Sequence, residues 1–138
     1  MKDASTIWDP LRKKDVALTP EESVRQWFIQ LLNKQSGVPL HLMGSEVELK
    51  YGVEGKTYRA DIVVYGKNTE PVAIVECKRA EVNLSQQTVA QALRYDYILN
   101  VKYIFITNGN SNFVCKRENG NFVFLDRFPT YEEMICQQ

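Results

Sequence analysis

Asp61, Glu76 and Lys78 are the residues of this sequence whose types and spacing could perform chemistry. Glu76 and Lys78 stand two apart at the end of the apolar stretch 72–78, and Asp61 lies fifteen residues upstream of Glu76 in a second strand-like stretch, 58–65. Side chains on a strand alternate between its two faces, so Glu76 and Lys78 share a face. The sequence therefore predicts an acid and a base side by side, with a second acid on a neighbouring strand.

The pairing of these two strands decides whether the acids meet. If Tyr65 pairs with Val72 across the loop, antiparallel geometry places Asp61 directly opposite Glu76, with their Cβ atoms about 5 Å apart. A register slipped by one residue would turn Asp61 away from Glu76. Cys77 points to the other face and is expected to be a core residue.

Two carboxylates held this close repel one another and need compensating positive charge. Oxygen ligands with remaining water positions suit Mg²⁺. Such an ion can polarise a phosphoryl oxygen and lower the pKa of a bound water, while Lys78 steadies the pentavalent charge or orients the attacking water. An ordinary cross-strand salt bridge is the structural alternative. Because the flanking residues are apolar and burying three charges is costly, the sequence favours a site that hydrolyses phosphodiester bonds.

Helices and strands that position these groups follow from local signals. Thr19 as N-cap, Pro20 at the first helical position and Glu22 in a capping box predict a helix that ends near 36. The apolar face of this helix is expected to comprise Val24, Trp27, Phe28, Leu31 and Leu32. Stretches 46–51, 58–65 and 72–78 are predicted to form an antiparallel three-stranded meander.

The sequence of the second half of the chain predicts a further strand that lies parallel to the last strand of this meander. A helix capped by Ser85 and running to about 100 is followed by the apolar stretch 103–107. This crossover predicts a fourth strand parallel to the third. Asn119-Gly120 predicts a tight turn in a hairpin formed by 112–117 and 121–126, and 131–138 could form a short helix. The fold class expected is α/β, with a mixed central sheet flanked by helices and a C-terminal β-hairpin.

Composition is that of one soluble domain. The 138 residues are expected to form a single unit with an irregular arm at 1–18, a catalytic core at 19–109, and a hairpin and tail at 110–138. Seventeen basic residues balance seventeen acidic ones, so any DNA-binding charge must be local. Candidates to line a phosphate path are Lys50, Lys56, Arg59, Arg79 and Arg94. The polar amino terminus and the lack of a long apolar run predict a cytoplasmic protein outside the membrane.

Several other chemistries are disfavoured. His41 is the only histidine, which argues against His-based triads and multi-His zinc sites. Cys77, Cys115 and Cys136 are far apart and show no C-x-x-C spacing, so they are expected to be reduced and mostly buried thiols. The chain has no G-x-x-x-x-G-K-[ST] loop for an ATP motor.

Asp61 and the E-x-K at 76–78 resemble the D…E-x-K signature of the PD-(D/E)xK nuclease superfamily. Gln91 and Tyr95 resemble the Q-x-x-x-Y element of the branch that includes the amino-terminal nuclease domain of type I restriction enzyme R subunits. The similarity extends from about residue 18 to ITNG near 109. The sequence departs from those subunits in lacking the motor, because their nuclease is fused to a DNA translocase.

The resemblance implies a restriction-endonuclease-like core and Mg²⁺-dependent DNA cleavage, with Mn²⁺ able to substitute. It implies that Asp61 and Glu76 are metal ligands, that Lys78 is the catalytic lysine, and that Gln91 and Tyr95 have supporting roles. The expected partners are DNA and either a translocase or specificity subunit or a second copy of the chain. Two alternatives stay open: a DNA-binding or assembly module that cleaves little by itself, and a repair or junction-resolving nuclease.

A glutamate from the first helix often joins the site in this superfamily. Glu21 and Glu22 are the two candidates here. Glu22 fits the capping box, whereas Glu21 lies nearer the apolar face defined by Val24 and Phe28. Glu21 is therefore the expected third metal ligand.

Overall fold

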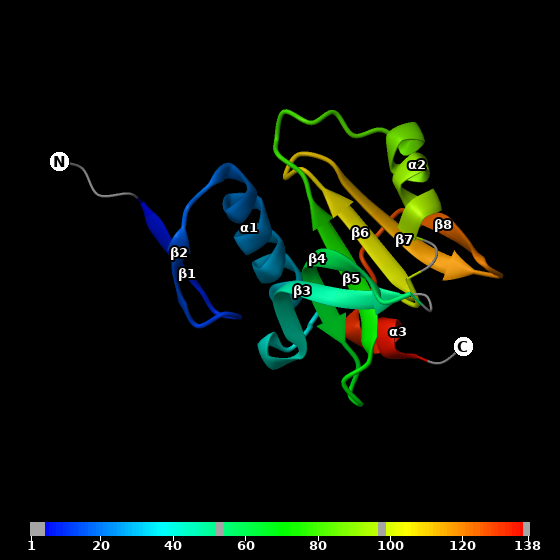
Figure 1. Ribbon diagram of the computed structural model, residues 1–138, viewed down its shortest axis with the longest axis horizontal. Helices are drawn as coiled ribbons and strands as arrows, with labels where there is room; N and C mark the ends of the chain where they lie inside the picture. The colour runs from blue at the N-terminus through cyan, green and yellow to red at the C-terminus, as the bar shows by residue number, and fades with distance from the viewer. Residues whose placement is uncertain (1–4, 52–53, 97–98, 137–138) are drawn as a thin grey trace.

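A computed structural model describes residues 5–51, 54–96 and 99–136, and its core is a six-stranded mixed sheet (Figure 1). The strands lie side by side in chain order, namely β3 (Met43–Tyr51), β4 (Lys56–Tyr65), β5 (Pro71–Cys77), β6 (Tyr103–Thr107), β7 (Asn112–Glu118) and β8 (Asn121–Leu125). Neighbours pair antiparallel except β5 and β6, which pair parallel. The predicted fold class is confirmed.

Helices cover both faces of this sheet (Figure 1). Helices α1 (Pro20–Lys34) and α3 (Tyr131–Ile135) pack on one face, and α2 (Gln86–Asp96) packs on the other. The core consequently has two apolar clusters, one on each side of the central strands. No helix among the described residues is long and apolar enough to cross a membrane.

Helix α1 begins as predicted but turns a different face to the sheet. Thr19 Oγ1 accepts a hydrogen bond from Glu22 N at 3.1 Å. The Glu22 carboxylate bonds other side chains, so only the Thr19 half of the predicted capping box is among the bonds described. Trp27, expected on the apolar face, is 42% exposed, whereas Ile29 is fully buried. The buried stripe of α1 is therefore rotated toward Arg25 and Ile29.

The crossover from β5 to β6 follows the prediction. Ser85 Oγ accepts a hydrogen bond from Thr88 N at 3.2 Å and caps α2, and Val89 and Leu93 are buried against the sheet. All five residues of β6 are buried, as the continuous apolar run predicts for a central strand. The site at the end of β5 is thus held by a strand that is paired on both sides.

The C-terminal hairpin is also confirmed. Asn119 and Gly120 both have positive φ, 52° and 83°, between β7 and β8. Two successive residues at positive φ define the type I′ turn that Asn-Gly favours.

The prediction of an irregular arm at residues 1–18 is wrong, because residues 6–17 form a hairpin of β1 (Thr6–Asp9) and β2 (Lys14–Ala17). A two-stranded hairpin is marginally stable by itself in water. Fully buried Asp9 fixes its turn by accepting hydrogen bonds from Leu11 N and Arg12 Nε. Arg12 then reaches out of the hairpin to two acids of the main body, which anchors it there.

The single histidine and the cysteines lie as expected. His41 is exposed in a 3₁₀ turn, Leu40–Leu42. Cys77 and Cys115 are buried free thiols, and Cys136 is an exposed one.

Helix α3 begins with a capping box whose contribution to stability is expected to depend on pH. Glu133 exchanges hydrogen bonds with Thr130, and the Arg127 guanidinium donates to both Glu133 carboxylate oxygens. These bonds, above all those from Arg127, lower the pKa of Glu133 from 4.5 to about 2. Because the folded-state pKa is depressed, the stabilisation is complete above the unfolded-state pKa and is lost as the pH falls from 4.5 to about 2.

An NMR titration of the Glu133 carboxyl carbon is expected to show a midpoint near 2 in the native chain. Arg127→Gln should move this midpoint up toward 4.5. A native midpoint close to 4.5 would show that the capping bonds do not form in solution.

Candidate active site

The pairing of β4 with β5 ends one residue before the two acids. Ile62 pairs with Val75, and Asp61 and Glu76 are the next residues along the two strands. Lys78 follows directly after β5, and its backbone N–H donates to Thr107 O at 2.7 Å, which continues the alignment with β6. The acid, acid and lysine thus lie near the C-terminal end of β5.

One detail of the predicted register is wrong. Tyr65 pairs with Pro71 rather than Val72, because the register shifts between Val64 and Tyr65. This bulge lies at the loop end of the two strands. It leaves the pairing near Asp61 unchanged.

Asp61 is held by donors on both carboxylate oxygens. Cys77 N donates to Oδ2 at 2.6 Å, and Arg25 Nη2 donates to Oδ1 at 3.3 Å. Burial raises the pKa of Asp61, and the Glu76 charge adds to this, whereas the Cys77 amide and Arg25 act in the opposite sense. The pKa is raised overall, because the hydrogen bonds and the Arg25 charge do not fully offset the cost of burying the charged form.

The alternation of side chains along β4 breaks at Asp61. Ala60 packs in the cluster beneath α2, whereas Ile62 packs in the cluster beneath α1, although a regular strand would place both on one face. The neighbouring strand β3 is irregular at the same level, where Glu46 has φ 53° and the ladder with β4 skips the Glu46 and Asp61 pair. This local break allows Glu46 and Asp61 to reach Arg25 of α1. Glu76 instead has the strand parity of Ile74, which packs in the cluster beneath α2, as does its partner Tyr58. Strained backbone of this kind is common at functional sites.

Glu76 is buried, and its carboxylate lies between the hydroxyl group of Tyr58 and the ammonium group of Lys78. It is 8% exposed, its Oε1 accepts a hydrogen bond from the Tyr58 hydroxyl, and its Oε2 lies 4.0 Å from Lys78 Nζ. The Lys78 side chain is 45% exposed and can move toward a substrate. Tyr58 was not among the predicted site residues, since a tyrosine on a strand gives no sequence signal of its own.

The remaining predicted site residues are less closely placed. Gln91 is exposed on α2, and no hydrogen bond described here joins it to Glu76 or Lys78. Tyr95 lies on the same helix, but its side chain is outside the described part of the structure. Glu21 is exposed at the start of α1, whereas Glu22 is buried in the polar network that reaches Asp61.

Basic groups proposed for a phosphate path are exposed where they are described. Lys50, Lys56, Arg59 and Arg79 all lie at the surface, and Arg94 has an undescribed side chain. Arg59 pairs with Glu46 at 3.0 Å and Arg79 with Glu81 at 3.7 Å.

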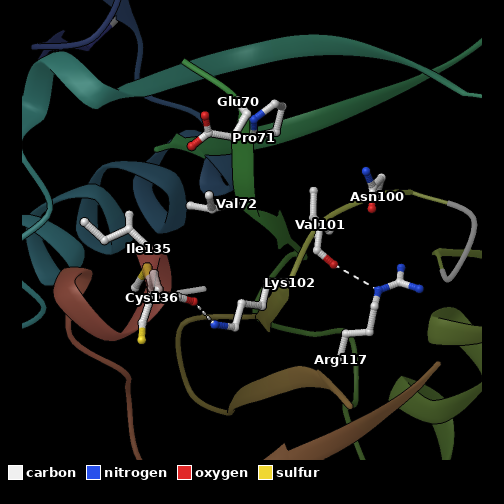
Figure 2. Close-up of a pocket in the computed structure, with 10 residues that line it drawn as sticks. Glu70, Pro71, Val72, Asn100, Val101, Lys102, Arg117, Ile135 and Cys136 are labelled. Carbon is white, nitrogen blue, oxygen red and sulfur yellow. Dashed lines mark hydrogen bonds between the residues drawn. The ribbon is translucent and has the colours of Figure 1, made fainter. Parts of the chain in front are cut away.

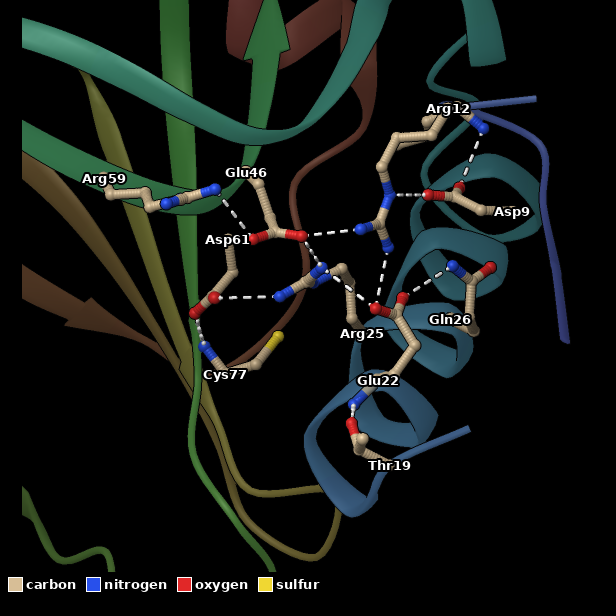
Figure 3. Close-up of polar contacts among 11 residues, drawn as sticks. Asp9, Arg12, Thr19, Glu22, Arg25, Gln26, Glu46, Arg59, Asp61 and Cys77 are labelled. Carbon is tan, nitrogen blue, oxygen red and sulfur yellow. Dashed lines mark hydrogen bonds and ion pairs between the residues drawn. The ribbon is translucent and has the colours of Figure 1, made fainter. Parts of the chain in front are cut away.

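A network of ion pairs behind Asp61 is the largest feature that the sequence did not predict (Figure 3). Buried Arg25 contacts Glu22, Glu46 and Asp61, which come from α1, β3 and β4. The sequence does contain a signal for this network. Arg25 stands four residues before Ile29 on the buried stripe of α1, where a charged residue needs partners of opposite charge.

The donor set around β5 suits a divalent ion held partly by water. Among the residues described, no three His, Cys, Asp or Glu side chains are grouped as a complete metal cage. Mg²⁺ does not require one, because it is commonly bound by one or two carboxylates together with waters and substrate phosphates. Asp61 and Glu76 are two carboxylates close enough for the charge of one to affect the other, and they offer oxygen donors of this kind.

Two pockets in the described part of the structure lie away from these acids. A pocket of about 340 Å³ opens at the N-terminal end of β5, where Pro71, Val72 and Lys102 meet α3 (Figure 2). A second one, of about 280 Å³, shares Pro71 and Val101 with it. The acids at the other end of β5 line neither of these two pockets.

The fold is that of the amino-terminal domains of restriction enzyme R subunits. The family described as Type I restriction enzyme R protein N terminus matches residues 20–129, and the chain belongs to this family. A search of curated proteins gives no significant match.

Solved structures show the same fold. A fragment assigned to an HsdR subunit of a type I restriction enzyme from Vibrio vulnificus YJ016 superposes with a TM-score of 0.58 at 24% identity over 84% of this chain. The protein in a cryoEM structure of a DrdV-DNA complex superposes with a TM-score of 0.52 at 24% identity over 76% of it. This chain covers 24% and 10% of the lengths of those two proteins.

Proposed function

We propose that this chain is an endonuclease domain that hydrolyses DNA phosphodiester bonds with Mg²⁺. The observation that supports the proposal is the pairing of Ile62 with Val75, beyond which Asp61 and Glu76 are the next residues of the two strands, with Lys78 directly after β5. Membership of the restriction enzyme R family supports a nuclease-type role. DNA as the substrate is supported by the similar fold of the protein in the DrdV-DNA complex.

Each member of the proposed site has a separate task. Asp61 and Glu76 hold the ion, and a bound Mg²⁺ would polarise a phosphoryl oxygen and lower the pKa of a coordinated water. Tyr58 fixes Glu76 by donating to Oε1, which leaves Oε2 on the side of Lys78. Lys78, half exposed, then stabilises the charge that develops on the phosphoryl oxygens or orients the attacking water.

Supporting roles for Gln91 and Tyr95 remain part of the proposal. The two residues are four apart on α2 and so share one helix face. Their task would be to orient Lys78 or a phosphate of the substrate.

The test is nicking of supercoiled plasmid DNA by the purified chain. Nicked and linear products are expected with Mg²⁺ or Mn²⁺ and none with EDTA, because the ion would polarise the phosphoryl group and lower the pKa of the attacking water. Cleavage that persists in excess EDTA would contradict the metal-dependent chemistry.

A DNA-binding or assembly module is the second candidate. It is favoured by the protein donors that already occupy both oxygens of Asp61, and by the small share of the similar proteins that this chain covers. Further domains of the kind present in those proteins, or a translocase, a specificity subunit or a second copy, would then be needed for cleavage. Salt-dependent DNA binding without nicking at any protein concentration would establish this candidate, and a panel of flap, junction and linear DNAs would separate a repair nuclease from a restriction nuclease.

A further inference from the structure

Arg25 is a buried cation that joins the first helix to the candidate metal ligand. Its side chain is 8% exposed, and its guanidinium contacts three carboxylates (Figure 3). Nη1 lies 3.1 Å from Glu22 Oε1 and 3.2 Å from Glu46 Oε1, and Nη2 lies 3.3 Å from Asp61 Oδ1. A charge this deeply buried depends on neighbouring charges of opposite sign for compensation, and these three acids supply it.

The ion-pair network around Arg25 contains several arginines, and these differ in whether they contact Asp61. Its described ion pairs join four carboxylates and three guanidinium groups, namely Asp9, Glu22, Glu46 and Asp61 with Arg12, Arg25 and Arg59. Arg12 pairs with three of these acids and Arg59 with Glu46. In the ion pairs described, Arg25 is the guanidinium that reaches Asp61.

The contacts of Arg25 are longer than those of its neighbour. Arg12 lies 2.5 Å from Glu46 and 2.7 Å from Glu22, the range of strong charge-assisted hydrogen bonds, whereas all three contacts of Arg25 exceed 3.0 Å. Arg25 is thus shared among three acids and bound tightly by none. Its contact with Asp61 can be given up while Glu22 and Glu46 continue to hold the guanidinium.

We propose that Arg25 is a positioning residue that holds Asp61 ready for the divalent ion and sets how tightly that ion binds. The inference rests on the proposed function. Arg25 orients Oδ1 and, as a fixed positive charge beside Asp61, repels a divalent cation bound to the same carboxylate. The wild-type site consequently binds the ion weakly when no substrate is present.

Binding of the DNA substrate then alters the balance between attraction of the ion by Asp61 and its repulsion by Arg25. A DNA phosphate brings negative charge to the end of β5, and Mg²⁺ commonly completes its coordination with substrate phosphates. The ion is therefore expected to bind mainly together with DNA, which limits cleavage to correctly placed phosphates.

Binding of Mn²⁺ to the DNA-free chain tests the inference without reference to activity. The loss of the free-ion EPR signal is measured for the wild type and for Arg25→Gln, which removes the charge. Arg25→Gln is expected to bind Mn²⁺ about tenfold more tightly, because the nearest fixed cation is gone. Arg25→Lys, which keeps the charge, should remain within about threefold of the wild type.

Arg59→Gln is the matched control. Arg59 contacts Glu46 at 3.0 Å in the same network, but its side chain is 65% exposed and it has no described ion pair with Asp61. Removing this solvent-screened charge should change the Mn²⁺ affinity by less than about threefold. If Arg25→Gln does not fold, as judged by circular dichroism, the double variant Arg25→Gln with Glu22→Gln is measured instead, because it removes one charge of each sign. This double variant is expected to bind Mn²⁺ more tightly than Glu22→Gln alone.

The outcomes distinguish the two proposals. Tighter binding in Arg25→Gln that disappears when Asp61→Asn is added supports the inference. Wild-type binding that depends on Asp61, with unchanged or weaker affinity in the folded Arg25 variants, would overturn the role of Arg25 and leave the proposed metal site standing. Absence of Asp61-dependent binding in every variant would remove the metal site itself, and the inference with it.

Discussion

Lys78→Met and Asp61→Asn are each expected to reduce Mg²⁺-dependent DNA nicking by at least about a hundredfold, as loss of one charged group that stabilises a transition state typically does. Lys78→Met removes the positive charge near the phosphoryl oxygens but keeps the length of an exposed side chain. Asp61→Asn keeps the size of the side chain and removes the charge that attracts the ion. Initial rates of plasmid nicking, measured at matched protein concentrations, give the effect.

The two variants should differ in how they respond to metal. Asp61→Asn should require more Mg²⁺ for its residual activity, whereas Lys78→Met should not, because Lys78 is not a ligand in the proposed site. Arg79→Met is a matched control for the lysine, since Arg79 is the next residue, is also exposed, and contacts Glu81 rather than the site acids. Activity equal to that of the wild type in both Asp61→Asn and Lys78→Met would rule out this site for the cleavage.

Phe28→Ala is expected to lower the free energy of unfolding by about 3–5 kcal/mol. Phe28 is fully buried on α1, and its ring makes edge contacts with Phe105 of β6 and with Phe128. The substitution therefore opens a cavity between α1 and the sheet that the surrounding strands cannot fill. Urea unfolding followed by circular dichroism measures the change, provided that the slope with denaturant stays constant.

Trp27→Ala serves as the control for this substitution. Trp27 is the neighbouring aromatic residue and is 42% exposed, so its loss should cost much less than that of Phe28. Equal losses of stability in the two variants would contradict the orientation of α1. Such a result would instead favour the apolar face that the sequence pattern predicted.

The parts of the fold that the sequence predicted correctly have local causes. Asn119-Gly120 specifies its own turn, because both residues must adopt positive φ. The stretch Tyr103–Thr107 is apolar throughout, which fits a strand covered on both faces, and the length of the crossover before it requires a parallel partner. Pairing of Ile62 with Val75 joins two continuous apolar runs that the sequence predicts to be neighbouring strands of a hairpin.

The parts that it missed depend on charged residues that are distant in sequence. The hairpin of residues 6–17 has short strands and is anchored by Arg12 to Glu22 and Glu46, contacts that no local pattern indicates. Sequence patterns treat charged residues as exposed, so Arg25 was not recognised as a residue of the buried stripe.

The candidate site stays a prediction in its function, and its surroundings differ from the sequence pattern. Asp61 on β4 lies one residue beyond the ladder with β5, near Glu76 and Lys78, but the break in alternation between Ala60 and Ile62 was not foreseen. That break turns Asp61 toward Arg25, and it depends on the left-handed backbone of Glu46 on the adjacent strand. A non-glycine residue in this conformation is held there by tertiary contacts, which a single strand pattern does not encode.

Diffraction from crystals soaked with Mn²⁺ tests the central claim most directly, because anomalous scattering locates the ion. The account predicts an anomalous peak within coordination distance of carboxylate oxygens of both Asp61 and Glu76, beside Lys78. A fully occupied Mn²⁺ site elsewhere on the chain, with no peak between these two acids, would contradict it.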